Sequence, residues 1–377
     1  MRKLSKVFAV VMALCMALLC VACGDKSNNP GQTNEDNGKT YNLVFTTHLP
    51  ETGVDGASLK YFLEQVTKET KGRVTFETYF GGSMTKSGET LEAVSGGLAD
   101  IAFVPEGFYE SQFYPLFVAM LPYSTTSEWV ANKALKEMFD TYEPFTEMCK
   151  KQGVVNLGPV VPSEVVIVST DKAINGLDDM QGLKIRAMGA VNSEMTMLGA
   201  TPVALDASEI YEALERDTVA AATGIPVTLA VSYKLQEVAD YFIFSGIGTY
   251  TTSSLYMNEK TWNSLPTDIQ EAFRTVYDRF VDEYSSDDWM GGELKKSIKA
   301  IEDAGKTVIA LDETEQAKWA EKLESTVADF VAKADSYGYN GQEILDTYRA
   351  LVEKYEPMDI ASVSYTHLRA HETLMNL

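Results

Sequence analysis

Few residues in this chain combine the types and the spacing that chemistry requires. The 377-residue sequence contains no G-x-S-x-G nucleophile motif, no G-x-G-x-x-G dinucleotide loop and no HExxH zinc motif. Of its 3 histidines, only His48 lies before residue 367. His48 follows a predicted strand at 41–46, and open α/β sheets bind ligands at the carboxyl ends of their strands. His48 is therefore interpreted either as a ligand contact or as a residue that caps its own loop.

The cysteines favour neither a disulfide nor a metal site. Of the 4 cysteines, Cys15, Cys20 and Cys23 lie in or next to an apolar segment at the N-terminus. Cys149 is the one cysteine expected in the folded body, and no histidine is close to it in sequence, so we predict that it packs in a core. No cofactor, metal or catalytic centre is predicted, and the protein is not expected to be an enzyme.

Composition and charge narrow the class of protein. A chain of this length that is 45% hydrophobic is expected to form about two domains. Its 54 acidic and 32 basic residues give a net charge of −22, which repels phosphate backbones and argues against nucleic-acid binding. A small buried site can still be locally positive, so an anionic ligand remains compatible with this charge.

The N-terminus is typical of export. Arg2, Lys3 and Lys6 precede an uncharged run from Val7 to Ala22, which is shorter than the roughly 20 residues that span a bilayer. The following Cys23 lies in a sequence that resembles a bacterial lipobox, so we expect residues 1–22 to be a signal peptide and Cys23 to be lipidated. A soluble secreted protein cleaved nearby is the alternative. Residues 23–40 contain no large apolar residue and are predicted to form a flexible, membrane-anchored tether on the extracytoplasmic side.

The C-terminal residues 362–377 do not continue the amphipathic pattern that precedes them. They resemble the translation of a sequencing-library adapter, and we expect them to be an artefact. His367 and His371 have an i, i+4 spacing but lack the glutamate of an HExxH site, so no metal site is predicted there.

The body of the chain is predicted to be an α/β protein. Strands are predicted at 41–46, at 73–79 from apolar alternation and at 101–104 from a short continuous apolar run. Helices are predicted between them, and this order implies a parallel sheet covered by helices. A second set of strands is predicted at 164–169 and 183–186. Asp206 and Glu209 have the spacing of a capping box for a helix at 208–214. Pro266 opens a long helix that is predicted to continue past a kink at Gly291-Gly292.

Eight short motifs occur in an order that resembles one family. The chain is similar to the solute-binding proteins of tripartite ATP-independent periplasmic (TRAP) transporters over about residues 41–355. The motifs that carry the resemblance are TTHLP (46–50), ETKGRV (69–74), LEAV-x-x-G-x-x-DI (91–101), LPY (121–123), GLKIR (182–186), LGATPV (198–203), EIY-x-AL (209–214) and W-x-x-LP-x-x-IQ (262–270).

The resemblance implies a two-lobed fold of the periplasmic-binding-protein type (type II-like). Parallel-rich sheets are flanked by helices, and a long helix spans both lobes. The expected lobe I comprises residues 41–163 plus about 252–290, and lobe II comprises 164–251 plus about 291–361. The family implies a receptor that captures a small organic carboxylate between the lobes and delivers it to membrane permease subunits.

The resemblance also implies the site residues. Arg186 matches the arginine that clamps the ligand carboxylate, for which a planar guanidinium is suited. His48 falls where the family has a polar contact, and Ser87 opens a helix where another is expected. The loop after Val104 supplies Pro105 or Glu106, with Tyr109 nearby; Glu106 is alternatively a solvated loop carboxylate.

Departures from the family pattern limit the ligand prediction. The acidic residues usual after the 209–214 helix are missing, which leaves Thr223 and Gly224 as candidates. Val166 lies close to the position where sialic-acid receptors carry a second arginine, so a simple or aliphatic carboxylate is favoured. A sensory receptor for a membrane kinase and, less favoured, a secreted hydrolase are the alternative functions.

Overall fold

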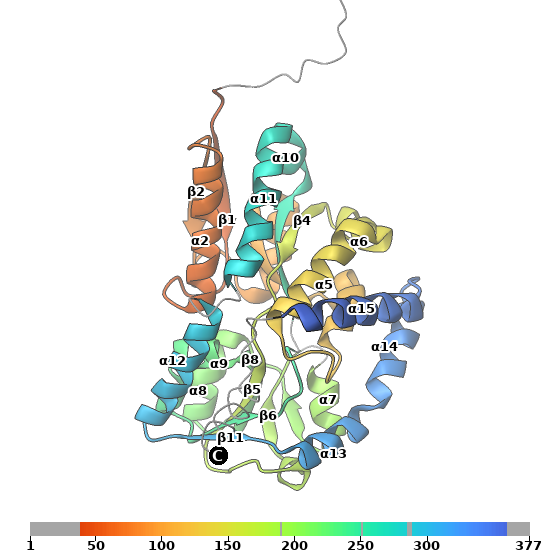
Figure 1. The fold of residues 1–377 in the computed structure, drawn as a ribbon. Helices are drawn as coiled ribbons and strands as arrows, with labels where there is room; N and C mark the ends of the chain where they lie inside the picture. Colours follow the sequence, from red (N-terminus) through yellow and green to blue (C-terminus); the bar gives the residue numbers. More distant parts are fainter. Residues whose placement is uncertain (1–37, 189–190, 250–251, 285–288, 360–377) are drawn as a thin grey trace, which may run out of the picture. The chain divides into compact units, whose positions relative to one another are not determined.

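The computed structural model describes residues 38–188, 191–249, 252–284 and 289–359, which form two β-sheets flanked by helices (Figure 1). The predicted signal peptide, Cys23, most of the tether and the tail at 362–377 lie outside these residues. No helix in the described ranges is long and apolar enough to cross a membrane.

The first sheet is built from residues 41–159 and one strand from later in the chain. In spatial order its strands are β2 (Val74–Tyr79), β1 (Tyr41–Thr46), β3 (Ile101–Pro105), β10 (Ser253–Asn258) and β4 (Val154–Pro159). β1 pairs in parallel with β2 and β3, which confirms the predicted β-α-β-α-β order. β10 is antiparallel to both β3 and β4.

The second sheet has the same mixed character. Its spatial order is β11 (Thr307–Ala310), β9 (Tyr241–Phe244), β5 (Val165–Ser169), β8 (Ala221–Pro226), β6 (Lys184–Arg186) and β7 (Thr201–Val203). β6 runs parallel to β7 and β8, and β9 runs parallel to β11, whereas β5 is antiparallel to both of its neighbours.

The antiparallel strands are those reached when the chain passes from one sheet to the other. β5 follows β4 after residues 160–164, and β10 follows β9 after residues 245–252. Hydrogen bonds hold the two crossings together, because the Val160 amide donates to the Ser253 carbonyl of β10 at 2.7 Å and the Val165 amide of β5 donates to the Gly248 carbonyl at 3.3 Å.

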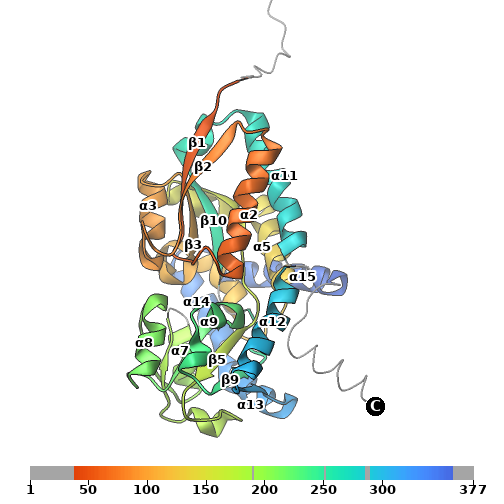
Figure 2. The same cartoon turned by 90° about the vertical axis from the view of Figure 1, so that its left-hand side faces the viewer.

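The helices next to the first sheet bury the apolar faces that the sequence pattern predicts. Leu59, Phe62, Leu63 and Val66 are buried on α2, which contacts α11 (Figure 2). The helical elements here are α2 (Val54–Glu69), η1 (Ser87–Glu89), α3 (Thr90–Gly96), η2 (Glu106–Phe108), α4 (Glu110–Phe113), η3 (Tyr114–Met120), α5 (Glu128–Thr141), α6 (Glu143–Lys151), α10 (Glu259–Ser264) and α11 (Thr267–Tyr284).

Among the helices next to the second sheet, η5 begins with the predicted capping box. Asp206 Oδ1 accepts the Ser208 amide at 3.0 Å and Glu209 Oε2 accepts the Asp206 amide at 2.9 Å. The helical elements are η4 (Leu177–Met180), α7 (Val191–Met197), η5 (Ala207–Glu209), α8 (Ile210–Glu215), α9 (Val227–Ser232), η6 (Leu235–Glu237), α12 (Met290–Asp303) and α13 (Glu313–Leu323).

The predicted long helix is divided differently from the expectation. α11 buries Ile269, Phe273, Val276, Phe280 and Tyr284, the apolar face that the sequence predicts. α12 begins at Met290, and Trp289 before it has non-helical dihedrals (φ −119°, ψ −100°). Gly291 and Gly292 therefore lie in the first turn of a second helix and form no kink; residues 285–288 lie outside the described ranges.

The last two helices pack on the first half of the chain. α14 (Ser325–Ser336) contacts η3, and α15 (Gly341–Tyr355) contacts both α5 and η3 (Figure 1). Phe330 and Tyr348 share a buried cluster with Val130 and Leu135 of α5. The expected lobe II included residues 291–361, whereas these two helices contact elements that precede residue 142.

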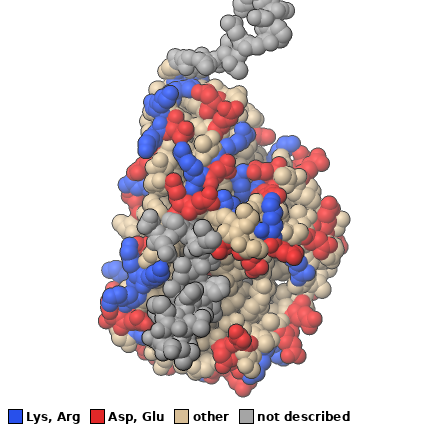
Figure 3. Space-filling view, viewed as in Figure 1, with Lys and Arg blue, Asp and Glu red and all other residues tan. Residues whose placement is uncertain are grey.

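Charged side chains of both signs share the surface. Figure 3 shows acidic and basic groups interspersed on one face. Exposed ion pairs of the described residues include Lys60–Glu51 (2.6 Å) and Arg279–Glu69 (2.8 Å). Each exposed pair contributes only about 0.2–1 kcal/mol, so these contacts favour solubility more than they stabilise the fold.

Candidate ligand-binding site

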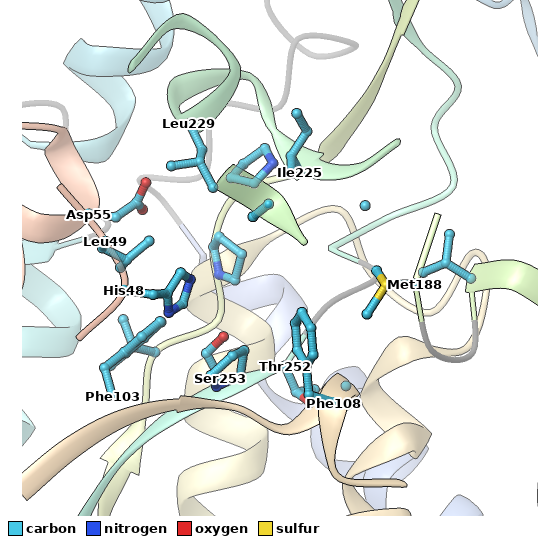
Figure 4. Close-up of a pocket in the computed structure, with 18 of the residues that line it drawn as sticks. His48, Leu49, Asp55, Phe103, Phe108, Met188, Ile225, Leu229, Thr252 and Ser253 are labelled. Carbon is cyan, nitrogen blue, oxygen red and sulfur yellow. The ribbon is translucent and has the colours of Figure 1, made fainter. Parts of the chain in front are cut away.

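A cavity of about 110 Å³ lies where the carboxyl ends of four strands meet. The segments after β1 and β3 line it from the first sheet, and the ends of β6 and β8 line it from the second. Val160, Pro162 and Thr252 of the connecting segments also line the cavity, together with Ser253 at the start of β10. Figure 4 shows Thr252 and Ser253 side by side. This is the position at which open α/β sheets bind ligands.

Arg186 ends β6 and lines the cavity with a side chain that is only 2% exposed. Its Nε donates to the Leu205 carbonyl and its Nη1 to the Thr223 carbonyl, each at 3.0 Å. A guanidinium has five N–H donors, so three remain on Nη1 and Nη2. Burial lowers the pKa of Arg186 to about 10, with Asp206 acting in the opposite direction, and the group stays charged at neutral pH. The two carbonyls thus fix a charged fork suited to a carboxylate.

Thr223 and Gly224 lie beside Arg186 in different roles. The Thr223 hydroxyl donates to the Val166 carbonyl at 3.0 Å, and the residue is buried behind the cavity. Gly224 lines the cavity with φ +77°, and a β-carbon there would lie 3.8 Å from Arg186 Nη1. Thr223 therefore positions the arginine, whereas Gly224 forms part of the wall.

His48 lines the cavity from the segment after β1, next to Leu49 and Phe103 (Figure 4). Its ring centroid is 5.8 Å from that of Phe103, and its Nδ1 is buried without a hydrogen-bond partner among the described residues. Burial lowers the pKa of His48 to about 4 against the opposing effect of Asp206, so the ring is neutral at pH 7. Its loop is held by Thr47, whose Oγ1 accepts the Leu49 amide at 3.1 Å.

Sequence analysis missed Asp55 and Tyr284, which also line the cavity. The Tyr284 hydroxyl at the end of α11 donates to Asp55 Oδ1 at 3.1 Å, and both residues are buried. Asp55 lies four residues before Leu59 and seven before Phe62, on the apolar stripe of α2. A carboxylate at a core-facing helix position was the available signal.

Four predicted site residues do not line the cavity: Thr223, described above, and Ser87, Tyr109 and Glu106. The Ser87 hydroxyl donates to Asp206 Oδ2 at 2.7 Å, and this contact joins the first half of the chain to the second. The Tyr109 hydroxyl accepts the Leu91 amide at 3.0 Å and ties η2 to α3. Glu106 is fully buried and faces Tyr256, whose hydroxyl donates to Glu106 Oε1 at 3.0 Å, so it is not a solvated loop carboxylate. Its neighbours Pro105, Gly107 and Phe108 line the cavity instead.

We expect Glu106 to make stability depend on pH. Burial raises its pKa to about 7, although hydrogen bonds from Ser254 and Tyr256 oppose this shift. A carboxyl whose folded pKa exceeds its unfolded value stabilises the fold fully below about pH 4.5 and loses that contribution as pH rises through 7. Glu106→Gln should therefore reduce the loss of stability between pH 5 and pH 8 by about 2 kcal/mol.

Thermal unfolding of wild type and Glu106→Gln at pH 5 and pH 8 measures this difference. Glu321→Gln, at an exposed helix position, is the matched control and should behave as wild type. An equal fall in melting temperature for wild type and Glu106→Gln would contradict the prediction.

Within the described ranges, no group of three or more His, Cys, Asp or Glu side chains is arranged to hold a metal ion. Cys149 is buried in the cluster that contains α5, and burial raises the pKa of its thiol, which agrees with the predicted packing role.

Comparison with known proteins finds one family and one fold. Residues 45–334 match the family described as bacterial extracellular solute-binding protein, family 7 (DctP). The C4-dicarboxylate-binding periplasmic protein DctP of Rhodobacter capsulatus is 27% identical over 281 residues, which cover 71% of this chain and 80% of that protein.

Two solved structures share the fold. A TRAP solute-binding protein of Rhodoferax ferrireducens with copurified benzoate aligns with a TM-score of 0.77 and 23% identity, covering 85% of this chain and 99% of that one. A marine metagenome TRAP solute-binding protein specific for aromatic acid ligands, in complex with 3-hydroxybenzoate, aligns with a TM-score of 0.76 and 23% identity. The alignment covers 84% of this chain and 99% of that one. The predicted two-lobed fold class is confirmed.

Proposed function

The chain belongs to bacterial extracellular solute-binding protein family 7, whose members serve TRAP transporters, and from this premise we propose that it captures a small organic carboxylate and delivers it to TRAP permease subunits. The observation that carries the proposal is the buried Arg186, which keeps three N–H donors beside a cavity with mostly apolar walls. A buried guanidinium without an ion-pair partner binds a carboxylate strongly, because the site is already dehydrated and oriented.

The cavity favours a monocarboxylate with an apolar body over a dicarboxylate. Arg186 is the only lysine or arginine among the described residues that line it, so a second carboxylate would find no second cation. Phe103, Phe108 and Leu229 supply apolar surface (Figure 4). Its volume of about 110 Å³ is comparable with that of an engineered cavity of about 150 Å³ that accepts benzene, so one ring or a short aliphatic chain fits the available space. The relatives with benzoate and 3-hydroxybenzoate support the same ligand class.

We propose that the two sheets belong to two lobes that close on the ligand. Lobe I comprises residues 41–163 and about 252–290 together with α14 and α15, and lobe II comprises residues 164–251 and about 291–323. The ligand would contact Arg186 on one lobe and His48 on the other. It favours the closed state only to the extent that it makes stronger contacts there than in the open state. The hydrogen bond from Ser87 to Asp206 is a direct contact between the two proposed lobes.

The proposed location is the outer face of the cell membrane. A lipid on Cys23 would hold the receptor near its permease, since each buried methylene contributes about 0.8 kcal/mol to membrane affinity. Residues 24–40 would then act as the tether.

A thermal-shift and calorimetric screen tests the proposed function. We expect at least one of benzoate, 3-hydroxybenzoate, butyrate or 4-hydroxybutyrate to stabilise the protein. A ligand at 100 times its dissociation constant adds about 2.7 kcal/mol. Benzamide and benzylamine are the neutral and cationic controls, and equal stabilisation by either would reject a carboxylate receptor. Mass spectrometry should recover the bound acid unchanged, whereas a converted product would indicate an enzyme.

A further inference from the structure

We propose that Asp55 is a second polar contact of the cavity, so that the ligand carries an N–H or O–H donor in addition to its carboxylate. This inference rests on the proposed function and narrows its ligand class to hydroxy acids or amino acids. It concerns a residue of α2 that lines the same cavity as Arg186.

The geometry of Asp55 leaves one oxygen available. The side chain is only 8% exposed and lines the cavity beside Leu49 and His48 (Figure 4). Tyr284 occupies Oδ1, whereas Oδ2 is buried and has no hydrogen-bond partner among the described residues. A buried acceptor left unpaired costs about 1–3 kcal/mol, and a ligand donor at Oδ2 would recover that cost on binding.

The charge of Asp55 also lacks a partner. No ion pair joins it to a lysine or arginine in the described part of the chain, and Arg186 is held instead by two backbone carbonyls. Burial raises the pKa of Asp55 to about 6, opposed by the hydrogen bond from Tyr284. At pH 7.5 the ionised form therefore predominates, and Oδ2 accepts a hydrogen bond from either an ammonium or a hydroxyl group.

A purely structural role for Asp55 explains less of what is observed. Anchoring Tyr284 uses one oxygen, and a neutral acceptor such as asparagine would serve that purpose without burying a charge. Asp55 lines the cavity, where Leu49 and Leu229 otherwise provide apolar walls. A ligand donor would satisfy the second oxygen, which Tyr284 leaves unpaired.

The test compares matched ligands by calorimetry at pH 7.5. The aromatic series is benzoate, 3-hydroxybenzoate and 3-(aminomethyl)benzoate, and the aliphatic series is butyrate, 4-hydroxybutyrate and 4-aminobutyrate. In wild type, at least one donor-bearing acid should bind about tenfold more tightly than its parent, as one hydrogen bond to a charged group provides. In Asp55→Leu, this advantage should fall below about threefold while the parent acid still binds.

Two further variants keep the test decisive. Asp55→Asn preserves shape and removes the charge, so it should abolish an ammonium advantage and retain part of a hydroxyl advantage, which distinguishes the two donors. Glu128→Gln alters another buried carboxyl that does not line the cavity and should leave the advantage unchanged. Circular dichroism verifies that each variant is folded.

Failure of the inference differs from failure of the proposed function. If parent acids bind but no donor-bearing acid binds more tightly, or if the advantage survives both Asp55→Leu and Asp55→Asn, the assignment of Asp55 is wrong and the carboxylate receptor stands. If no acid in either series binds, the proposed function itself fails, and this inference fails with it.

Discussion

Arg186→Met is expected to weaken binding of the preferred carboxylate by roughly 100- to 1000-fold. Removing one partner of a buried, hydrogen-bonded charge pair costs about 2–5 kcal/mol, and each 1.4 kcal/mol is a factor of ten. Methionine fills much of the same space but offers no donor, so the ligand carboxylate would lose its hydration and gain no charge-assisted hydrogen bond in exchange.

Arg186→Lys separates charge from geometry. Lysine keeps the positive charge but lacks the planar fork, so we expect a loss of about tenfold, between wild type and Arg186→Met. Arg216→Met replaces an exposed arginine on the surface and should leave affinity unchanged. Calorimetric affinities for all three variants provide the measurement. Affinity within twofold of wild type in Arg186→Met would exclude the arginine as the carboxylate clamp.

Gly56→Ala is expected to destabilise the fold by about 3 kcal/mol or more and to lower the melting temperature by at least about 5 °C. A β-carbon at Gly56 would lie 1.9 Å from the Pro50 carbonyl oxygen and 2.8 Å from its carbon. Both are backbone atoms, so the clash can be relieved only by separating α2 from the loop that carries His48. The same movement would displace Asp55, which adjoins Gly56, and should weaken ligand binding.

Gly96→Ala is the matched control for this clash. Gly96 ends α3, and a β-carbon there meets no atom within 4 Å, so alanine should be neutral or slightly stabilising through its better helix propensity. Differential scanning calorimetry of the two variants measures the contrast. A melting temperature for Gly56→Ala within 1 °C of wild type would show that the loop at residue 50 can move away from α2 without a loss of stability.

Local patterns in the sequence predicted the elements that carry the site. A short continuous apolar run placed β3, and its parallel pairing with β1 follows from the intervening helices. The GLKIR motif placed Arg186 at the end of a strand, and the structure places that residue on the cavity. These predictions succeed because strand ends and helix caps depend on residues that are close in sequence.

Side-chain direction was beyond such patterns. In the loop after β3, Pro105 and Gly107 line the cavity while Glu106 between them faces Tyr256. Which way an individual loop side chain points depends on packing partners, here a residue 150 positions later in the chain. The same reasoning applies to α15, whose apolar face is evident in the sequence although the pattern does not say which core receives it.

The first sheet and the core beside it receive β10 and α15 only after β5 to β9 of the second sheet have been synthesised, and this order limits when folding can be completed. β10 lies between β3 and β4 in the first sheet, and α15 covers η3 and α5 beside it. A nascent chain that ends at residue 250 lacks the strand that joins its earlier strands, and one that ends at residue 325 still exposes the apolar surface that Tyr348 and Val352 bury. Domains usually fold as units once all their parts have been synthesised. A polypeptide with this topology therefore cannot complete its first sheet and the core beside it until its last helices have been synthesised.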